Sequence, residues 1–174
     1  MEIELERTFL LKYKPKDLEK YPHHEITDVY FPKEEFHPVL RLRNIDNKKF
    51  QMTKKFPING KDSSEQEEHT IILTKQEFDA MAKASGKKVV KVRYYYQLPG
   101  GQRAEVDIFS DKLKGLGLVD FEFKTKEEKE NFMATDFCLA EVSQDKWLAG
   151  GILAGKGYKD IEKVFKKYNY KKIK

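Results

Sequence analysis

Residues 1–14 read MEIELERTFLLKYK, and acidic and apolar side chains alternate from Glu2 to Glu6. Alternation with a period of two is typical of a β-strand, in which successive side chains point to opposite faces. Glu2, Glu4 and Glu6 therefore share one face with Thr8, and Ile3 lies on the other. Because neighbouring carboxylates repel one another, this face is expected to lie opposite cations.

Similar patterns recur along the chain and predict eight strands. We place them at 2–10, 24–31, 38–45, 49–56, 65–73, 88–97, 102–109 and 117–125. Helical signals predict short helices at 15–21, 74–84, 126–133 and 160–168, and the glycines at 150, 151, 155 and 157 predict a loop. No linker or repeat divides the chain. Residues 1–174 are therefore expected to form one α+β domain, an antiparallel sheet or barrel with helices packed outside.

The charge balance is mildly basic, with 34 Lys and Arg against 29 Asp and Glu and a net charge of +5. This bias favours anionic partners, but it is too small to indicate nucleic-acid binding. Cys138 is the one cysteine, which excludes a disulfide framework. With no apolar run of membrane-spanning length and no signal-peptide pattern, a cytoplasmic protein without a membrane partner is expected, as a monomer or a homodimer.

The polar faces of the predicted strands carry almost only ionisable side chains. The acids are Glu4, Glu6, Glu68, Glu105, Asp107, Asp120 and Glu122, and the bases are Arg41, Arg43, Lys55, Lys91, Arg93 and Arg103. Each strand taken alone is also explained by a solvated face on an antiparallel sheet. If the sheet closes, the same faces line a water-filled channel with an acidic and a basic sector. Carboxylates bind Mg²⁺ and converging Arg and Lys bind phosphate, so such a channel suits a metal–polyphosphate complex.

Several short segments, in this order, resemble the CYTH superfamily of triphosphate tunnel metalloenzymes. The start, ELERTFL at 4–10, resembles the ExExK signature of that family. The later segments are DVYF at 28–31, LRLR at 40–43, MTKK at 52–55, KVRY at 91–94, EVDIF at 105–109, DFEF at 120–123 and EVSQD at 141–145. Each segment is weakly specific alone, but the ordered series is strong and covers residues 2–147.

The resemblance implies a closed eight-stranded antiparallel barrel with the charged residues inside and a C-terminal helix outside. Family members cleave tripolyphosphate or thiamine triphosphate, or cyclise ATP, with a divalent metal. Carried over by position, the metal ligands for Mg²⁺ or Mn²⁺ are Glu4, Glu6, Asp120 and Glu122, with Glu68 as a further candidate. Glu105 and Asp107 join Glu4 and Glu6 as candidate catalytic acids, and the phosphate clamp is Arg41, Arg43, Lys55, Lys91, Arg93 and Arg103.

Thr8 departs from the family pattern, because it stands where the signature has a lysine and cannot supply that charge. The leading hypothesis is metal-dependent hydrolysis of a triphosphate, most simply inorganic tripolyphosphate. A class IV-type adenylate cyclase and a thiamine triphosphatase are alternatives within the enzyme class. A polyphosphate- or nucleotide-binding module with little turnover is the alternative that Thr8 motivates, and an RNA-binding protein is a third hypothesis. In the Tyr94–Tyr96 run, Tyr95 is expected to enter the tunnel and its two neighbours to pack outside.

Overall fold

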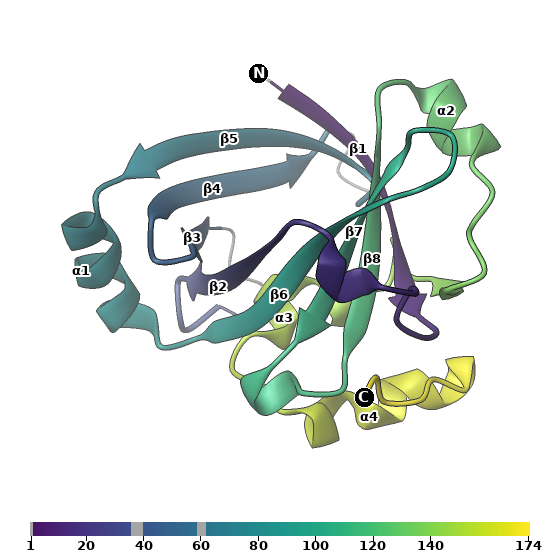
Figure 1. The fold of residues 1–174 in the computed structure, drawn as a ribbon. Coiled ribbons are helices and arrows are strands. Elements are labelled where there is room, and N and C mark those ends of the chain that lie inside the picture. The colour runs from purple at the N-terminus through teal and green to yellow at the C-terminus, as the bar shows by residue number, and fades with distance from the viewer. Residues whose placement is uncertain (1, 36–39, 59–61) are drawn as a thin grey trace.

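A computed structural model describes residues 2–35, 40–58 and 62–174 (Figure 1). The side chain of Glu2, the first two residues of the strand predicted at 38–45 and part of the polar loop after Pro57 lie outside this description. The strands are β1 (Glu2–Leu11), β2 (His23–Phe31), β3 (Leu40–Ile45), β4 (Lys49–Pro57), β5 (Glu65–Leu73), β6 (Lys88–Gln97), β7 (Arg103–Phe109), β8 (Gly117–Phe123) and β9 (Cys138–Glu141). The eight predicted strands are thus confirmed within two residues wherever their ends are described.

Eight of the strands close into an antiparallel barrel. Their order is β5-β4-β3-β2-β6-β7-β8-β1, and β1 pairs with β5 to complete the ring. The closure depends on β1, because its first residues pair with β5 while Leu5–Leu10 pair with β8. The predicted barrel is therefore confirmed, and closure removes the exposed sheet edges.

The ninth strand, β9, is not predicted by the sequence patterns. It pairs with Phe9–Leu11 at the end of β1, with a register shift between Leu10 and Leu11. A four-residue strand is too short to show the alternation from which strands are predicted.

Helix α1 (Lys75–Ser85) covers the outer face of β2, β3 and β4 (Figure 1). It begins at a capping box, in which Thr74 Oγ1 accepts from the Glu77 amide and the Glu77 carboxylate accepts from the Thr74 amide. Phe78 then packs on Phe50 with the ring centroids 5.3 Å apart. The helix predicted at 74–84 is confirmed, and it buries the apolar outer face of this side of the barrel.

The C-terminal part of the chain packs across one end of the barrel (Figure 1). Helix α3 (Gly150–Leu153) and helix α4 (Tyr158–Phe165) share an apolar cluster with Val89, Phe109 and Leu118 from the inner faces of β6, β7 and β8. This cluster forms an apolar floor beneath the charged interior.

The loop expected at the glycines 150–157 is wrong in part, because Gly150–Leu153 is helical. A Cβ at Gly150 would lie 1.9 Å from Tyr30 Oη, so glycine here permits the close approach of α3 to the barrel wall.

The remaining helices are shorter than expected. Where a helix is predicted at 15–21, the structure has a single 3-10 turn at Leu18–Lys20. The helix predicted at 126–133 is α2 (Lys126–Asn131). The prediction at 160–168 is α4 followed by a 3-10 turn at Lys166–Tyr168. Among the residues described, no helix combines the length and apolar character needed to cross a membrane.

Candidate active site: a tunnel with two charged halves

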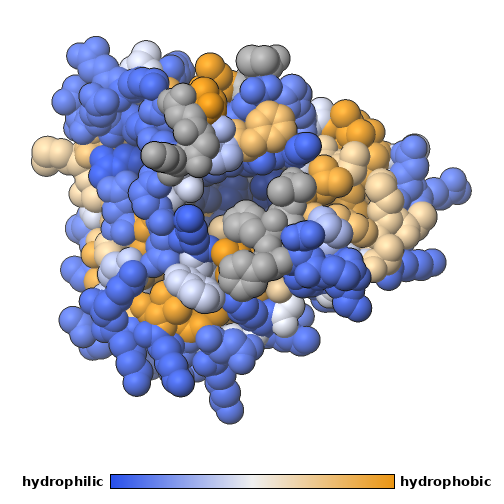
Figure 2. Space-filling model, turned by 180° about the vertical axis from the view of Figure 1, so that it is seen from behind, coloured by the Kyte–Doolittle hydropathy of each residue, from blue (hydrophilic) through white to orange (hydrophobic). Residues whose placement is uncertain are grey.

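The charged side chains predicted to share inner faces line one cavity of about 490 Å³ inside the barrel, which we call the tunnel. Figure 2 shows a hollow on one face of the molecule with hydrophilic side chains visible inside it. Of the predicted site residues, Glu4, Glu6, Glu68, Glu105, Asp107, Asp120, Glu122, Arg41, Arg43, Lys55, Lys91 and Arg93 all line the tunnel. The structure therefore brings together groups that are spread over more than a hundred residues of sequence.

Strand order sorts these groups into two contiguous halves. The acidic strands β7, β8, β1 and β5 are neighbours around the barrel, and so are β4, β3, β2 and β6, of which β4, β3 and β6 carry the bases. The halves meet at two seams, β6 against β7 and β4 against β5. Acid and base are adjacent at the seams, whereas the centre of the acidic half, where β1 meets β8, holds like charges.

At the β6–β7 seam Arg93 holds three carboxylates. Its guanidinium donates to Asp107 at 2.7 Å, to Asp120 at 2.9 Å and also to Glu105. Lys91 adds an ion pair to Asp107, whose side chain is almost fully buried. Burial alone would raise the pKa of Asp107, but Arg93 and Lys91 outweigh it and lower the pKa to about 2.

At the β4–β5 seam Lys55 bridges two strands. Its ammonium pairs with Glu4 from β1 and lies 3.2 Å from Glu68 on β5. Burial opposes the charged form of Lys55, yet Glu6 and Glu4 raise its pKa above the ordinary value. Lys55 in turn lowers the pKa of Glu68 against the effect of burial.

One acid, Asp28, lies within the basic half. It sits on β2, opposite Arg43 on β3, and accepts two hydrogen bonds from that guanidinium at 2.7 and 2.8 Å. Although burial favours the neutral acid, the pKa of Asp28 lies well below its usual value because Arg43 outweighs that effect. The alternation of β2 places Asp28 and Tyr30 on one face, but the sequence patterns single out neither as a site residue.

At the centre of the acidic half, nearby cations do not outweigh the effect of burial on the carboxyl pKa. Glu6 and Glu122 face each other across β1 and β8. Burial raises the pKa of Glu6 to about 8, with Lys55 opposing and Glu4 and Asp120 adding to the rise. Burial, with Glu105 and Glu4, also raises the pKa of Glu122. These carboxyls would gain from a cation placed between them.

The centre of the basic half contains a guanidinium with no charged neighbour directly beside it in the sheet. Arg41 lies on β3, flanked in the sheet by Tyr30 and Thr53, which carry no charge at neutral pH. Its Nε is buried and has no hydrogen-bond partner in the described structure. Buried polar atoms are nearly always satisfied, so an unpartnered guanidinium nitrogen on a residue that lines a cavity indicates a site for an anion.

Thr8 lies on the inner face beside Asp120. Its hydroxyl donates to Asp120 at 2.8 Å, and its amide donates to Ser143 Oγ at 3.0 Å. The segment after β9 is thereby held against β1, and Lys146 from this segment lines the tunnel. The sequence leaves the role of Lys146 open, so its entry into the tunnel is new information from the fold.

Arg103 is the one predicted site residue that does not line the tunnel. It begins β7, its side chain is 54% exposed, and it lies 3.6 Å from Glu105 and over the ring of Tyr95. Tyr95 itself lines the tunnel as expected, whereas Tyr94 and Tyr96 pack on the outer apolar cluster. Arg103 is thus placed at the rim.

Comparison with known proteins agrees with this geometry. The CYTH domain family matches residues 2–148, which is most of the chain. The chain belongs to the CYTH domain family. This CYTH domain is 31% identical to the inorganic triphosphatase of Nitrosomonas europaea over 108 residues, which are 62% of this chain and 68% of that protein.

Solved structures extend the comparison to the fold. The crystal structure of an inorganic triphosphatase superposes on this CYTH domain with a TM-score of 0.64 at 26% identity, covering 88% of this chain and 95% of the other. A candidate adenylate cyclase of Bacillus halodurans gives a TM-score of 0.53 at 18% identity over 94% of this chain and 98% of its own. At that identity the second likeness shows the shared barrel alone.

The acidic half of this CYTH domain has the donor chemistry that a hard divalent cation takes. Carboxylate oxygens are the preferred ligands of Mg²⁺, and a nearby cation would favour the charged form of Glu6, whose pKa is raised to about 8 by burial and by Glu4 and Asp120. Within the described ranges, however, no three acidic, histidine or cysteine side chains already converge as a metal site. Glu4 and Asp120 are instead turned toward Lys55 and Arg93. The residues fit a divalent cation by chemistry, and these ion pairs have to loosen for it to bind.

Proposed function

We propose that this CYTH domain hydrolyses a triphosphate inside the tunnel, with inorganic tripolyphosphate as the leading substrate and Mg²⁺ or Mn²⁺ as the cofactor. The observation that carries the proposal is the buried, unsatisfied Nε of Arg41 at the centre of the basic half. An inorganic triphosphatase among the relatives supports the same reaction.

The basic half would hold the phosphates. Arg41 offers the unsatisfied donor, and Arg43, Lys55, Lys91 and Arg93 add positive charge around it. A guanidinium group binds two phosphate oxygens with its fixed fork of N–H donors. This orients the triphosphate and offsets the negative charge that grows during phosphoryl transfer. Arg103 at the rim would meet the substrate as it enters.

The acidic half would hold the cation. Glu6 and Glu122 lie at its centre, and Glu4, Glu68 and Asp120 lie around them. When bound, the divalent cation supplies charge neutralisation and polarises the phosphoryl group. Glu105 and Asp107 keep Arg93 in place and would orient water for attack on a terminal phosphorus. Attack breaks one phosphoanhydride bond and converts tripolyphosphate and water into phosphate and pyrophosphate.

The direct test is phosphate release from tripolyphosphate, ATP and thiamine triphosphate, with and without Mg²⁺ or Mn²⁺. We expect metal-dependent release, fastest from tripolyphosphate. The double variant Glu4→Gln with Glu6→Gln should lose that release. Glu127→Gln with Glu130→Gln on α2 is the matched control, because it removes the same charge away from the tunnel. Full activity of the tunnel variant would refute the metal assignment.

A binding module with little turnover is the second candidate, and two observations favour it. Thr8 supplies no charge to the tunnel and only hydrogen-bonds Asp120. Glu4 and Asp120 are also already engaged by cations of the protein. Tight binding of tripolyphosphate by calorimetry, with no phosphate released from any of the three substrates, would establish this candidate and exclude the enzyme.

A further inference from the structure

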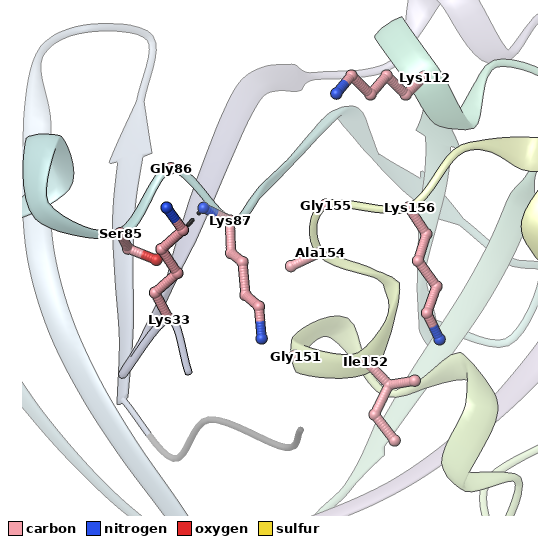
Figure 3. Close-up of a pocket in the computed structure, with 10 residues that line it drawn as sticks. All are labelled: Lys33, Ser85, Gly86, Lys87, Lys112, Gly151, Ile152, Ala154, Gly155 and Lys156. Carbon is pink, nitrogen blue, oxygen red and sulfur yellow. Dashed lines mark hydrogen bonds between the residues drawn. The ribbon is translucent and has the colours of Figure 1, made fainter. Parts of the chain in front are cut away.

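A second cavity borders α3, and Figure 3 shows the residues that line it. We call it the outer cavity. It has a volume of about 450 Å³ and is lined by Lys33, Ser85, Gly86, Lys87, Lys112, Gly151, Ile152, Ala154, Gly155 and Lys156. Its four lysines come from four segments: the end of β2, the turn after α1, the turn between β7 and β8, and the loop after α3.

None of the described residues that line the outer cavity carries a carboxylate. Lys87 Nζ donates to a backbone oxygen, that of Glu35, at 2.6 Å. Lys156 Nζ lies over the ring of Trp147, 5.1 Å from its centroid. For Lys33 and Lys112, no ion pair is found in the part of the chain that the structure describes. As far as the structure describes it, the lining of the outer cavity thus contains four lysines and no acid.

Solvated lysines on a surface would be the ordinary explanation for these charges. The lysines of the outer cavity differ from solvated surface lysines in two ways. The lysines surround a concave space, and Lys87 and Lys156 are half-buried rather than fully exposed. Small residues also line the space between them, among them Gly86, Gly151 and Ala154.

We propose that the outer cavity is a second binding site for phosphate-rich anions, and that its ligand is an extended inorganic phosphate chain. Lysine ammonium groups bind phosphate as point charges and impose little geometry. In Figure 3 the four lysine side chains stand on different sides of the cavity and do not converge on one point. That spread suits a chain of linked phosphates better than a single phosphate. Binding here requires no turnover, so the site is independent of the proposed hydrolysis.

The position of the site places its ligand directly behind the tunnel. Gly151 lines both cavities, and α3 is the wall between them. Because α3 separates the two cavities, each of them has to bind its own anion. This separation makes them distinguishable by counting binding events.

The test is isothermal titration calorimetry with tripolyphosphate in EDTA, which prevents metal-dependent hydrolysis. The wild-type protein should bind at two sites. The triple variant Lys33→Gln, Lys87→Gln, Lys112→Gln should weaken one event at least tenfold and leave the other, whereas Arg41→Met should weaken only the remaining one. Orthophosphate should bind the outer cavity much more weakly than tripolyphosphate.

Two controls keep the outcome clear. Lys83→Gln, Lys114→Gln, Lys159→Gln removes the same charge from exposed positions outside the lining and should keep both events. The lysine-to-arginine version of the triple variant should also keep both, which separates lost charge from damaged packing. One binding event in the wild type, abolished by Arg41→Met, would overturn the proposal. Equal weakening by the exposed-lysine control would do so as well. Absence of hydrolysis would overturn only the proposed function.

Discussion

The tunnel and the outer cavity lie on opposite sides of α3, and they differ in whether carboxylates accompany the cations among the described lining residues. In the tunnel, Arg43, Lys55, Lys91 and Arg93 each pair with a carboxylate, and Arg41 stands apart. In the outer cavity the described lining residues include lysines and no acid. Charges inside a barrel are costly to bury unless they are paired, whereas charges on loops can keep their water. Pairing in the tunnel therefore stabilises the fold, and a cation such as Arg41, whose Nε has no hydrogen-bond partner among the described residues, is available to a ligand.

The largest effect is expected from removing a cation that is paired with carboxylates in the tunnel. Arg93→Met should destabilise the protein by about 3–5 kcal/mol, because it leaves buried carboxylates without their shared partner. The measurement is urea unfolding followed by circular dichroism. Lys88→Met changes an exposed position on the same strand and should have little effect. Equal stabilities for the two variants would mean that the seam ion pairs do not hold the barrel.

The variant Asp28→Asn tests another ion pair of the tunnel, through the pH dependence of the free energy of unfolding. The pKa of Asp28 is lowered in the folded protein, so its charge stabilises the fold above the unfolded pKa of about 3.9. That contribution is lost as pH falls through this value toward the lower folded pKa. The variant should be about 3 kcal/mol less stable at pH 7, and its deficit should narrow below about pH 4.

Urea midpoints from pH 7 to pH 3 measure this deficit. Asp79→Asn, which breaks an exposed pair with Lys75 on α1, is the control and should show no comparable dependence. A deficit that stays constant across the range would contradict the assignment of the stabilisation to the Asp28 charge.

Arg41→Met tests the unpaired side of the tunnel. Removing a charged donor to phosphate should lower kcat/KM for tripolyphosphate about 10- to 100-fold. Stability should change little, because no protein group loses a hydrogen bond from Nε. Steady-state kinetics and urea unfolding on the same preparation separate the two effects. A large loss of stability would show that Arg41 is a structural partner like Arg93.

The smallest effect is expected in the outer cavity. Lys33→Gln should change the free energy of unfolding by less than about 0.5 kcal/mol, as for most exposed substitutions. Thermal unfolding in phosphate-free buffer measures it, and added tripolyphosphate should then raise the wild-type midpoint more than that of the variant. A clear loss of stability in phosphate-free buffer would mean that the lysine is paired within the fold.

The sequence predicts the tunnel residues well because each lies on a strand with a clear two-residue period. Alternation alone assigns Glu4 and Glu6, or Arg41 and Arg43, to a common face of their strand. Predictions are poorer where no period is available. The four-residue strand β9 and the four-residue helix α3 are too short for one, and Arg103 begins its strand where the barrel opens.

The sequence by itself determined which side chains share an inner face, the number of long strands and the family to which they belong. Only the tertiary structure decided the order of those strands around the barrel. That order places the acidic strands in one half and the strands with bases in the other, so seam residues form ion pairs, while Arg41 lies between uncharged neighbours and Glu6 faces another acid. The physical reason is that pairing between strands depends on long-range closure, whereas the direction of a side chain depends on its own strand alone.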